Sequence, residues 1–280
     1  MKHVIIGASG QVGTYLYQKL GQVGEDVTGT YYRHPQTGYK ALDMSDTEAV
    51  ESLLSAIKPD VVWIPAAMAN VDFCEENPEL SYEHNVRAPQ IVAELASKQG
   101  ARIVFFSTDY VFDGMNGPYQ EKDPVHPIMV YGQHKAEMEQ YLLTQVPHSL
   151  VIRPAWIYSR DDNPRNFVYR VLSELKRGHA VKAVTDQWNT PTPSDGLVNM
   201  AWKALQDEFE GILHIVGPER LTRYELTKRI AKAFGYAVDL VEPVTTESFH
   251  LPAKRPLNGG LKTQHSSYRL VAGRDFEPLF

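Results

Sequence analysis

The sequence is poor in cysteine, lacks long apolar runs and carries no excess of positive charge. Cys74 is the one cysteine in 280 residues, which excludes an intrachain disulfide and a cluster of thiolate metal ligands. The formal net charge is -6 and the pI is about 5.9. A surface that binds nucleic acid or an anionic membrane carries the opposite charge. We therefore expect a protein that binds small molecules and has no nucleic-acid partner.

No apolar stretch is long enough to cross a bilayer, and the first residues form a short β-type run instead of a signal peptide. These features predict a cytoplasmic protein with no membrane partner. The 10 histidines stand in unrelated contexts, without the spacing of metal ligands. We therefore predict no metal site.

What the sequence does contain begins with a glycine-rich turn. An apolar run at residues 3–6 leads into Gly-Ala-Ser-Gly-Gln-Val-Gly, and a helical pattern follows. Glycines permit a sharp turn and a close approach to a pyrophosphate, and the unpaired N–H groups of the new helix attract the phosphates. An ordinary glycine turn is the alternative. We expect a dinucleotide cofactor to bind at Gly7, Ser9, Gly10, Gln11, Val12 and Gly13.

A second candidate segment follows the apolar run at residues 104–106, where Ser107 and Thr108 precede Asp109. In an open α/β sheet, ligands gather at the carboxyl ends of the parallel strands. The two hydroxyls are therefore predicted to face a ligand crevice. Taken alone, the segment also fits hydroxyls that only cap the strand.

Tyr131 and Lys135 are four residues apart, so on a helix their side chains project from one face. The free phenol has a pKa of about 10, and a fixed positive charge beside it lowers that pKa toward neutrality. Such a tyrosine can give a proton to a carbonyl. Because the same spacing also arises by chance on solvated helices, the interpretation depends on the glycine turn and the hydroxyl pair.

Strand and helix patterns alternate along the chain, which predicts an α/β fold with a Rossmann-type doubly wound parallel sheet. We expect strands at residues 3–6, 26–31, 61–64, 102–106, 150–153 and 213–216, and helices at 46–57, 80–99, 129–144, 163–177, 195–206 and 222–234. The pattern becomes less regular after Arg153. We expect an NAD(P)-binding core at residues 1–155, rejoined at about 191–217, and a smaller C-terminal substrate-binding lobe from residues 156–190 and 218–280.

These segments together resemble the extended short-chain dehydrogenase/reductases, and within them the dTDP-4-dehydrorhamnose reductase family. The resemblance is carried by the glycine turn, residues 107–114 (Ser-Thr-Asp-Tyr-Val-Phe-Asp-Gly), residues 118–121 (Pro-Tyr-Gln-Glu), the Tyr131 to Lys135 stretch, residues 153–159 (Arg-Pro-Ala-Trp-Ile-Tyr-Ser) and residues 255–258 (Arg-Pro-Leu-Asn). It runs nearly from end to end.

The resemblance implies that NAD(P)H reduces the 4-keto group of a nucleotide-linked 6-deoxy sugar, giving a dTDP-L-rhamnose-like product. By the same resemblance, Tyr131 gives the proton to the carbonyl oxygen, and Thr108 hydrogen-bonds that oxygen. Lys135 lowers the pKa of Tyr131 and holds the nicotinamide ribose. A donor aimed at that oxygen stabilises the negative charge that develops there. Ser107 is the alternative to Thr108 as the hydrogen-bond donor to the carbonyl, and it is also expected to contact the cofactor. The family expectation for assembly is a homodimer.

The end of the second strand favours NADPH over NADH. NAD-dependent enzymes place an acidic residue there, whereas this chain has Arg33, whose guanidinium suits a 2′-phosphate. The alternative for Arg33 is a solvated loop charge, and NADH is the second candidate cofactor. The resemblance also places Asp43 and Met44 by the adenine and Ala66, Ala67 and Met68 beneath the cofactor.

Trp156 is the candidate for contact with the sugar, because an indole face stacks well on the apolar face of a sugar ring. Packing in the core is its alternative role. Thr108 and Asp109 are expected on the substrate side of the crevice.

Three positions depart from the family pattern. Pro65 stands where an asparagine is usual, the segment Trp188-Asn189 lacks an expected glycine, and His134 replaces a small hydroxyl residue. The first two lie where cofactor or sugar is held. A relative of the rhamnose precursor is therefore a second candidate substrate.

Two other functions stay open. A nucleotide-sugar epimerase or dehydratase shares the superfamily, but a dehydratase typically has a glutamate after Thr-Asp, where this chain has Tyr110. Relatives of the family also serve as NADP-binding regulatory subunits of methionine adenosyltransferase, and they can keep the tyrosine and lysine.

Overall fold

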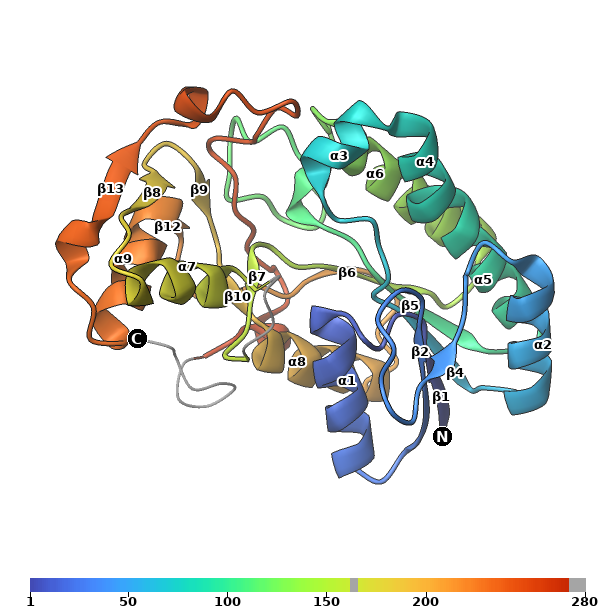
Figure 1. Cartoon of the computed structure of the whole chain (residues 1–280). Helices are drawn as coiled ribbons and strands as arrows, with labels where there is room; N and C mark the ends of the chain where they lie inside the picture. Colours follow the sequence, from blue (N-terminus) through green and yellow to red (C-terminus); the bar gives the residue numbers. More distant parts are fainter. Residues whose placement is uncertain (162–165, 272–280) are drawn as a thin grey trace.

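The computed structural model describes residues 1–161 and 166–271 (Figure 1). Within them, seven parallel strands form one sheet in the order β11-β6-β5-β4-β1-β2-β3. The strands are β1 (Lys2–Ile5), β2 (Asp26–Tyr31), β3 (Lys40–Ala41), β4 (Val61–Ile64), β5 (Arg102–Phe106), β6 (Leu150–Arg153) and β11 (Gly211–His214). The strand order reverses between β1 and β4, which is the switch point where such sheets bind dinucleotides. The predicted Rossmann-type fold is confirmed.

Helices cover both faces of this sheet, so the central strand β4 (VVWI) is apolar and buried throughout. Trp63 of β4 faces the cluster that includes Leu16, whereas its neighbour Val62 faces the cluster that includes Val92. Figure 1 shows the two helical layers. The first layer is α1 (Gln11–Gln22) and α8 (Ser194–Gln206), and the second is α2 (Thr47–Ile57), α5 (Ala88–Lys98) and α6 (Val130–Gln145).

A smaller lobe lies beside the sheet, at the left of Figure 1. Its own apolar cluster joins α7 (Phe167–Lys176) to α9 (Arg223–Ala233) and to the parallel pair β8 (Val181–Val184) and β13 (Val241–Val244). Two pairs of short strands connect it to the core: β7 (Ile157–Tyr158) pairs with β10 (Thr192–Pro193), and β9 (Trp188–Asn189) pairs with β12 (Leu221–Thr222). Tyr268 and Leu270 pack in the same cluster as α8, so the described end of the chain lies against the sheet layer.

Most strands and helices lie where the sequence predicts them, and the exceptions are informative. The strands expected at 3–6 and 213–216 are shifted by one and two residues, to β1 and β11. The helix expected from residue 163 begins at Phe167, and residues 162–165 lie outside the described part of the chain. The pairing of β8 with β13 was not predicted, because it joins segments distant in sequence.

The single long helix expected at 80–99 is interrupted. It consists of α4 (Pro78–Tyr82), a π-helical turn (Glu83–Arg87) and α5. Within the turn, Asn85 accepts a hydrogen bond from the Met68 N–H at 2.9 Å and donates to the Met68 carbonyl at 3.1 Å. Such π-turns often mark functional sites. Here the turn fixes the segment that follows β4.

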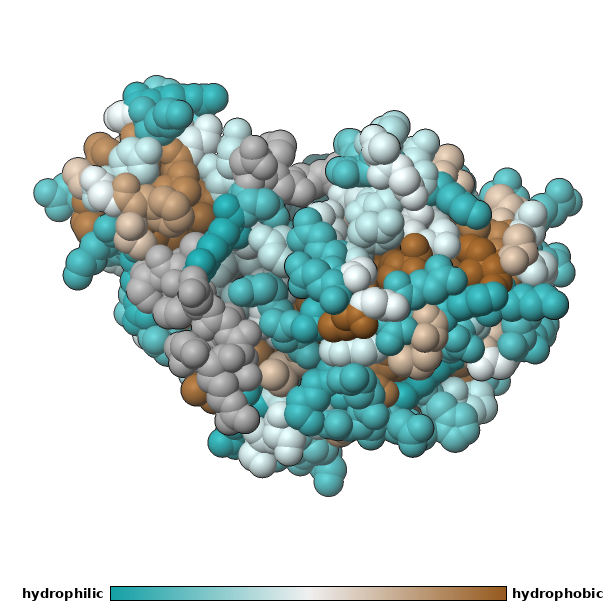
Figure 2. All heavy atoms as spheres, turned by 90° about the horizontal axis from the view of Figure 1, so that it is seen from below, coloured by the Kyte–Doolittle hydropathy of each residue, from teal (hydrophilic) through white to brown (hydrophobic). Residues whose placement is uncertain are grey.

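The face shown in Figure 2 is mostly hydrophilic, with apolar residues in separate patches. In residues 1–161 and 166–271, no helix is both long and apolar enough to span a bilayer. The same residues contain no group of His, Cys, Asp and Glu side chains placed to hold a metal ion.

Candidate active site

The glycine turn between β1 and α1 is shaped by close backbone packing. Gly7 has a φ of 89°, and a Cβ there would lie 2.8 Å from the Cβ of Ala66. A Cβ on Gly13 would lie 2.3 Å from the Gly7 carbonyl oxygen. Gly10 donates to that same oxygen at 3.0 Å. The turn therefore accepts no side chain at positions 7 and 13 without displacement of the backbone.

The first turn of α1 is open to an anion. Gly10 is the N-cap, no side chain caps the helix, and its first turn contains no acidic residue. The backbone N–H groups of residues 11–13 are thus available to a pyrophosphate. Gln11 also donates to the Ser159 hydroxyl at 3.0 Å, which ties the turn to the segment after β7.

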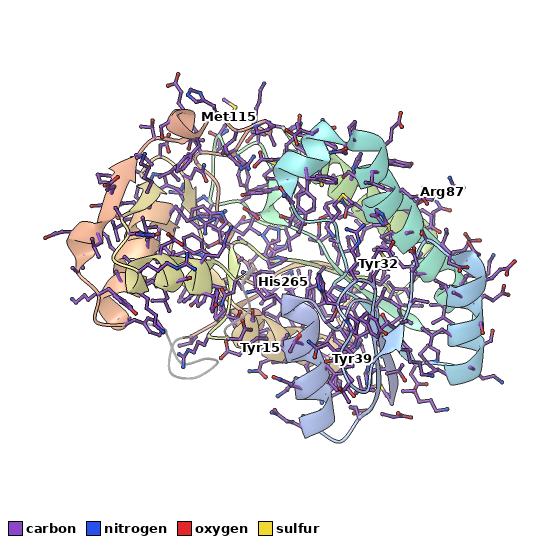
Figure 3. The ribbon with its side chains drawn as sticks, in the orientation of Figure 1. Tyr15, Tyr32, Tyr39, Arg87, Met115 and His265 are labelled. Atoms are coloured by element: carbon purple, nitrogen blue, oxygen red, sulfur yellow. The ribbon has the colours of Figure 1, made fainter. Side chains whose placement is uncertain are left out.

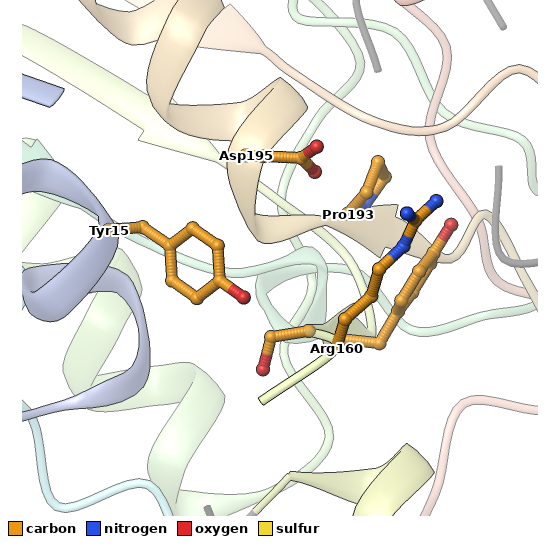
Figure 4. Close-up of a pocket in the computed structure, with 6 residues that line it drawn as sticks. Tyr15, Arg160, Pro193 and Asp195 are labelled. Carbon is orange, nitrogen blue, oxygen red and sulfur yellow. The ribbon is translucent and has the colours of Figure 1, made fainter. Parts of the chain in front are cut away.

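A small pocket lies beside this turn, between the core and the lobe (Figure 4). The Tyr15 ring of α1 points across it toward Arg160, and Asp195 lies at the start of α8. None of the residues at the Tyr131 site lines this pocket. It belongs to the junction of core and lobe.

Arg33 lies in an exposed loop just past β2, with its guanidinium 5.2 Å from the centroid of the Tyr32 ring. Figure 3 shows Tyr32 on the side of the sheet where α1 begins. Asp43 lies between β3 and α2 and accepts from the backbone and hydroxyl of Ser45 at 3.0 and 2.7 Å. Burial raises the pKa of the Asp43 carboxyl, but these bonds and one with Tyr32 outweigh it and lower the pKa. Arg33, Tyr32 and Asp43 thus form one local group.

The segment after β4 passes close to the glycine turn. Ala66 donates its N–H to the Ile6 carbonyl at 3.2 Å, and Asn85 holds Met68 by both backbone groups. Asn85 was not predicted as a site residue. The signal in the sequence was an asparagine in the middle of the helix predicted at 80–99, and the structure shows that this side chain is buried.

Ser107, Thr108 and Asp109 are all buried at the carboxyl end of β5. The Ser107 hydroxyl has no hydrogen-bond partner among the described residues, which leaves it free for a ligand. Thr108 donates to Asp109 Oδ1 at 3.1 Å and accepts from the Tyr110 N–H at 3.2 Å. Burial raises the pKa of Asp109 to about 6, against hydrogen bonds from Asn189 and Thr108 that lower it.

Tyr131 and Lys135 share the buried face of α6, as the spacing predicted. The Lys135 ammonium donates to the Phe106 carbonyl at 2.6 Å and lies 4.0 Å from the centroid of the Phe105 ring. Burial lowers the pKa of Lys135 to about 7, although the Glu139 carboxylate raises it.

The expected lowering of the Tyr131 pKa is wrong for this structure. Burial raises the pKa of the phenol, and negative charge on Cys74, Asp109 and Tyr110 raises it further. Burial is the main reason, and Lys135, whose ammonium donates to the Phe106 carbonyl, does not lower the pKa of the phenol. Tyr131 is therefore a protonated phenol at neutral pH.

Trp156 lies between the core and the lobe, with an unusual φ of 37° for a bulky residue. The Arg223 guanidinium lies 3.5 Å from the centroid of its ring and 4.4 Å from that of Phe167. Burial lowers the pKa of Arg223 to about 10, while Tyr110 and Asp109 raise it. No carboxylate of a described residue forms an ion pair with Arg223.

Arg223 was missed in the sequence. It occupies the first position of α9, between Thr222 and Glu225, which form the capping box of this helix. A cation in the first turn of a helix opposes the helix dipole. That conflict was a usable signal that the residue serves a purpose other than helix stability.

The structure thus gathers two groups of predicted residues. Near the end of β5 and the start of α6 lie a phenol, a hydroxyl and a carboxyl, and the Tyr131 and Tyr110 rings are 6.4 Å apart. Near the glycine turn lie the open helix terminus and the Ala66 backbone. A phenol and a hydroxyl are the donors that a carbonyl needs when it accepts hydride.

Comparison with known proteins gives consistent matches. The family model described as the RmlD substrate binding domain matches residues 1–277. The chain is 34% identical to the dTDP-4-dehydrorhamnose reductase of Aggregatibacter actinomycetemcomitans, over 92% of this chain and 89% of that protein. It is 30% identical to the methionine adenosyltransferase 2 subunit beta of Danio rerio, over 92% of this chain and 82% of that protein.

Among solved structures, the dTDP-4-dehydrorhamnose reductase of Bacillus anthracis in complex with NADP is 29% identical. It superposes with a TM-score of 0.86 and covers 95% of this chain and 92% of that chain. The family resemblance found in the sequence is confirmed: the chain belongs to the dTDP-4-dehydrorhamnose reductase family, matched over nearly its whole length by the RmlD substrate binding domain.

Proposed function

We propose that this protein is an NADPH-preferring oxidoreductase that reduces the 4-keto group of a nucleotide-linked 6-deoxy sugar, with dTDP-4-dehydro-L-rhamnose as substrate and dTDP-L-rhamnose as product. The observation that carries the proposal is the placement of the Tyr131 phenol and the Thr108 hydroxyl, both buried at the carboxyl ends of the central strands. The reductases of Aggregatibacter and Bacillus anthracis support it by their similarity over most of the chain.

The residues present fit a dinucleotide. The glycine turn and the open terminus of α1 lie at the switch point of the sheet, and the unpartnered Ser107 hydroxyl follows β5 at the same edge. Arg33 would meet a 2′-phosphate, Asp43 and Met44 the adenine, and Ala66, Ala67 and Met68 the underside of the cofactor. NADPH, when bound, supplies the hydride that reduces the ketone.

The protein's own part is to supply donors and a proton. Tyr131 is protonated at neutral pH, since its ordinary pKa of 10 is raised further by burial, and it therefore has a proton to give to the oxygen of the reduced carbonyl. Thr108 offers a second hydroxyl to the same oxygen. Lys135, held by the Phe106 carbonyl one turn from the phenol, carries a positive charge below its pKa of about 7 and would hold the nicotinamide ribose.

The substrate would lie between the core and the lobe. One face of the Trp156 indole is covered by the Arg223 guanidinium, and its other face would meet the sugar. Asp109 lies beside Thr108, and Arg223 carries no ion pair with a described carboxylate. A guanidinium suits the diphosphate of a nucleotide sugar. In this arrangement residues 1–155 and about 191–217 hold the cofactor, and residues 156–190 and 218–280 form the substrate lobe. We place the enzyme in the cytoplasm as a homodimer.

The experiment is to supply purified protein with NADPH and a series of nucleotide-linked 4-keto-6-deoxy sugars and to follow NADPH consumption and product. Consumption with the dTDP-4-keto-6-deoxy-L sugar supports the proposal. The similarity to the Danio rerio subunit favours a second candidate, a regulatory subunit of methionine adenosyltransferase. Binding of NADPH without reduction of any sugar, together with a change in the activity of a methionine adenosyltransferase, would establish that candidate instead.

A further inference from the structure

A buried hydrogen-bond chain joins the lobe to the Thr108 hydroxyl. Asn189 of β9 donates from Nδ2 to Oδ2 of Asp109 at 2.6 Å, and its own Oδ1 accepts from the Thr190 N–H at 2.8 Å. On the other side of the same carboxyl, Oδ1 of Asp109 lies 3.1 Å from the Thr108 hydroxyl. Asn189 belongs to the segment that lacks the glycine of the family pattern, and a glycine there could make no such side-chain bond.

The geometry limits where Asp109 can carry a proton. The Asn189 amide can only donate through Nδ2, so Oδ2 of Asp109 must accept whether the carboxyl is ionised or neutral. A proton on Asp109 is therefore confined to Oδ1, which faces Thr108.

The protonation state of Asp109 then decides whether the Thr108 hydroxyl can donate a hydrogen bond to the substrate. The Thr108 oxygen already accepts from the Tyr110 N–H, which leaves it one further lone pair and its own proton. If Asp109 is ionised, Thr108 must donate to it and has no proton to offer a carbonyl. If Asp109 is neutral, Asp109 donates to Thr108, and the Thr108 proton is free for the substrate.

We propose that Asn189 is a positioning residue that, through Asp109, sets the direction of the Thr108 hydrogen bond, and that the enzyme form with neutral Asp109 is the one whose Thr108 donates to the substrate carbonyl. The inference rests on the proposed reductase function. It concerns only the position of a proton on the enzyme, and NADPH still supplies the hydride that reduces the carbonyl.

The surroundings of Asp109 are compatible with a neutral form near physiological pH. Burial is the largest influence and raises its pKa to about 6, while the bonds from Asn189 and Thr108 and the charge of Arg223 on α9 lower it. The other titratable groups that face it are the phenols of Tyr110 and of Tyr131 on α6, whose pKa values it raises. Bound substrate would exclude more water and raise the Asp109 pKa further.

The sharpest test is Asp109→Asn, which places a permanent neutral donor between the same two partners. The new amide can accept from Asn189 through oxygen and donate to Thr108 through nitrogen. We expect the variant to keep reducing the keto sugar and the alkaline limb of kcat/KM to move from near the Asp109 pKa of about 6 up to the Lys135 pKa of about 7. An Asp109→Asn enzyme that binds NADPH but is inactive at every pH, or that keeps the wild-type alkaline limb, overturns the inference.

A second variant keeps the test decisive if Asp109→Asn does not fold. Asn189→Ala removes a bond that stabilises the carboxylate, so the alkaline limb of kcat/KM should move up by about one pH unit. Loss of a merely structural contact would lower activity at all pH values and leave the limb in place, which contradicts the inference. Asn77→Ala is the matched control, because its amide donates only to the Phe73 carbonyl on the surface and should leave the profile unchanged.

The two hypotheses fail in different ways. If wild type reduces no nucleotide sugar, the proposed function fails before the variants are compared. If wild type reduces the sugar and the limb does not respond to Asn189→Ala or Asp109→Asn, only the inference about Asn189 fails. Lys135, with a pKa of about 7, then becomes the group that sets the limb.

Discussion

The Lys135 ammonium donates a hydrogen bond to the Phe106 carbonyl at 2.6 Å. This cation, one helical turn after Tyr131, is therefore anchored to strand β5. The lysine side chain is 1% exposed. Burying an ammonium costs free energy, and the depressed pKa of about 7 expresses that cost.

Lys135→Met should therefore change how stability depends on pH. Between the folded pKa of about 7 and the ordinary value of 10.5, the unfolded wild-type chain binds more protons than the folded chain. Wild-type stability should thus rise with pH relative to the variant, by up to ~1.4 kcal/mol per pH unit. Urea unfolding of both proteins at two pH values in this window measures the difference, and a constant difference contradicts a buried ammonium. The variant should also bind NADPH more weakly.

Arg33→Ala tests the choice of cofactor. If the guanidinium meets a 2′-phosphate, NADPH affinity should fall by ~10- to 100-fold, since a charge-assisted bond to an anion contributes about 1.5–3 kcal/mol. NADH affinity should change little. Equal losses for both cofactors would show that Arg33 does not contact the phosphate. Arg87→Ala is the control, because Arg87 is an exposed arginine on the outer helices (Figure 3) and should alter neither affinity.

The pair Arg153 and Glu139 lies behind Lys135, fully buried, with Arg153 Nε donating to Glu139 Oε1 at 2.9 Å. Glu139→Gln leaves the guanidinium without its counter-charge, so we expect a loss of about 3–5 kcal/mol in the free energy of unfolding. Glu94→Gln is the matched control, since Glu94 pairs with Lys98 in solvent, and it should cost under about 0.5 kcal/mol. Similar small losses for both variants would mean that the buried pair is not ionic.

Two glycines of α1 allow the effect of tight packing to be distinguished from the effect of helix propensity. Gly13→Ala would place a Cβ 2.3 Å from the Gly7 carbonyl oxygen, so it should displace the glycine turn and weaken NADPH binding. Gly21→Ala meets nothing within 4 Å and should stabilise the protein by about 0.5–1 kcal/mol. Calorimetry and NADPH titration of the two variants make the comparison. An unaffected Gly13→Ala protein would contradict the packing described for the turn.

The sheet could be predicted from the sequence because β4, β5 and β6 are short apolar runs (VVWI, RIVFF and LVIR) that alternate with helical patterns. Residues 26–31, 61–64, 102–106 and 150–153 form strands at the expected positions. The helix at 80–99 was predicted without its interruption, since the π-turn depends on the distant Met68 backbone that Asn85 holds. Local pattern carries no information about such a contact.

The site was predictable to the same extent. Thr108, Tyr131 and Lys135 follow local motifs, and the structure places them near the end of β5 and in the first two turns of α6. Asn189 contacts Asp109 across 80 residues of sequence, and Arg223 comes from the lobe. Only the fold brings these two to the site. The direction of the Lys135 ammonium was likewise not predictable, because it is set by the Phe106 carbonyl.

The central claim is that Tyr131 supplies the proton for reduction of a keto sugar by NADPH. The most direct measurement is single-turnover oxidation of bound NADPH after mixing with the dTDP-4-keto-6-deoxy-L sugar, in wild type and Tyr131→Phe, with NADPH affinity measured for both. We expect wild type to oxidise NADPH and Tyr131→Phe to do so at least ~100-fold more slowly, with nearly unchanged NADPH affinity. Equal rates in the two proteins, or no oxidation in wild type that binds NADPH, would contradict the account.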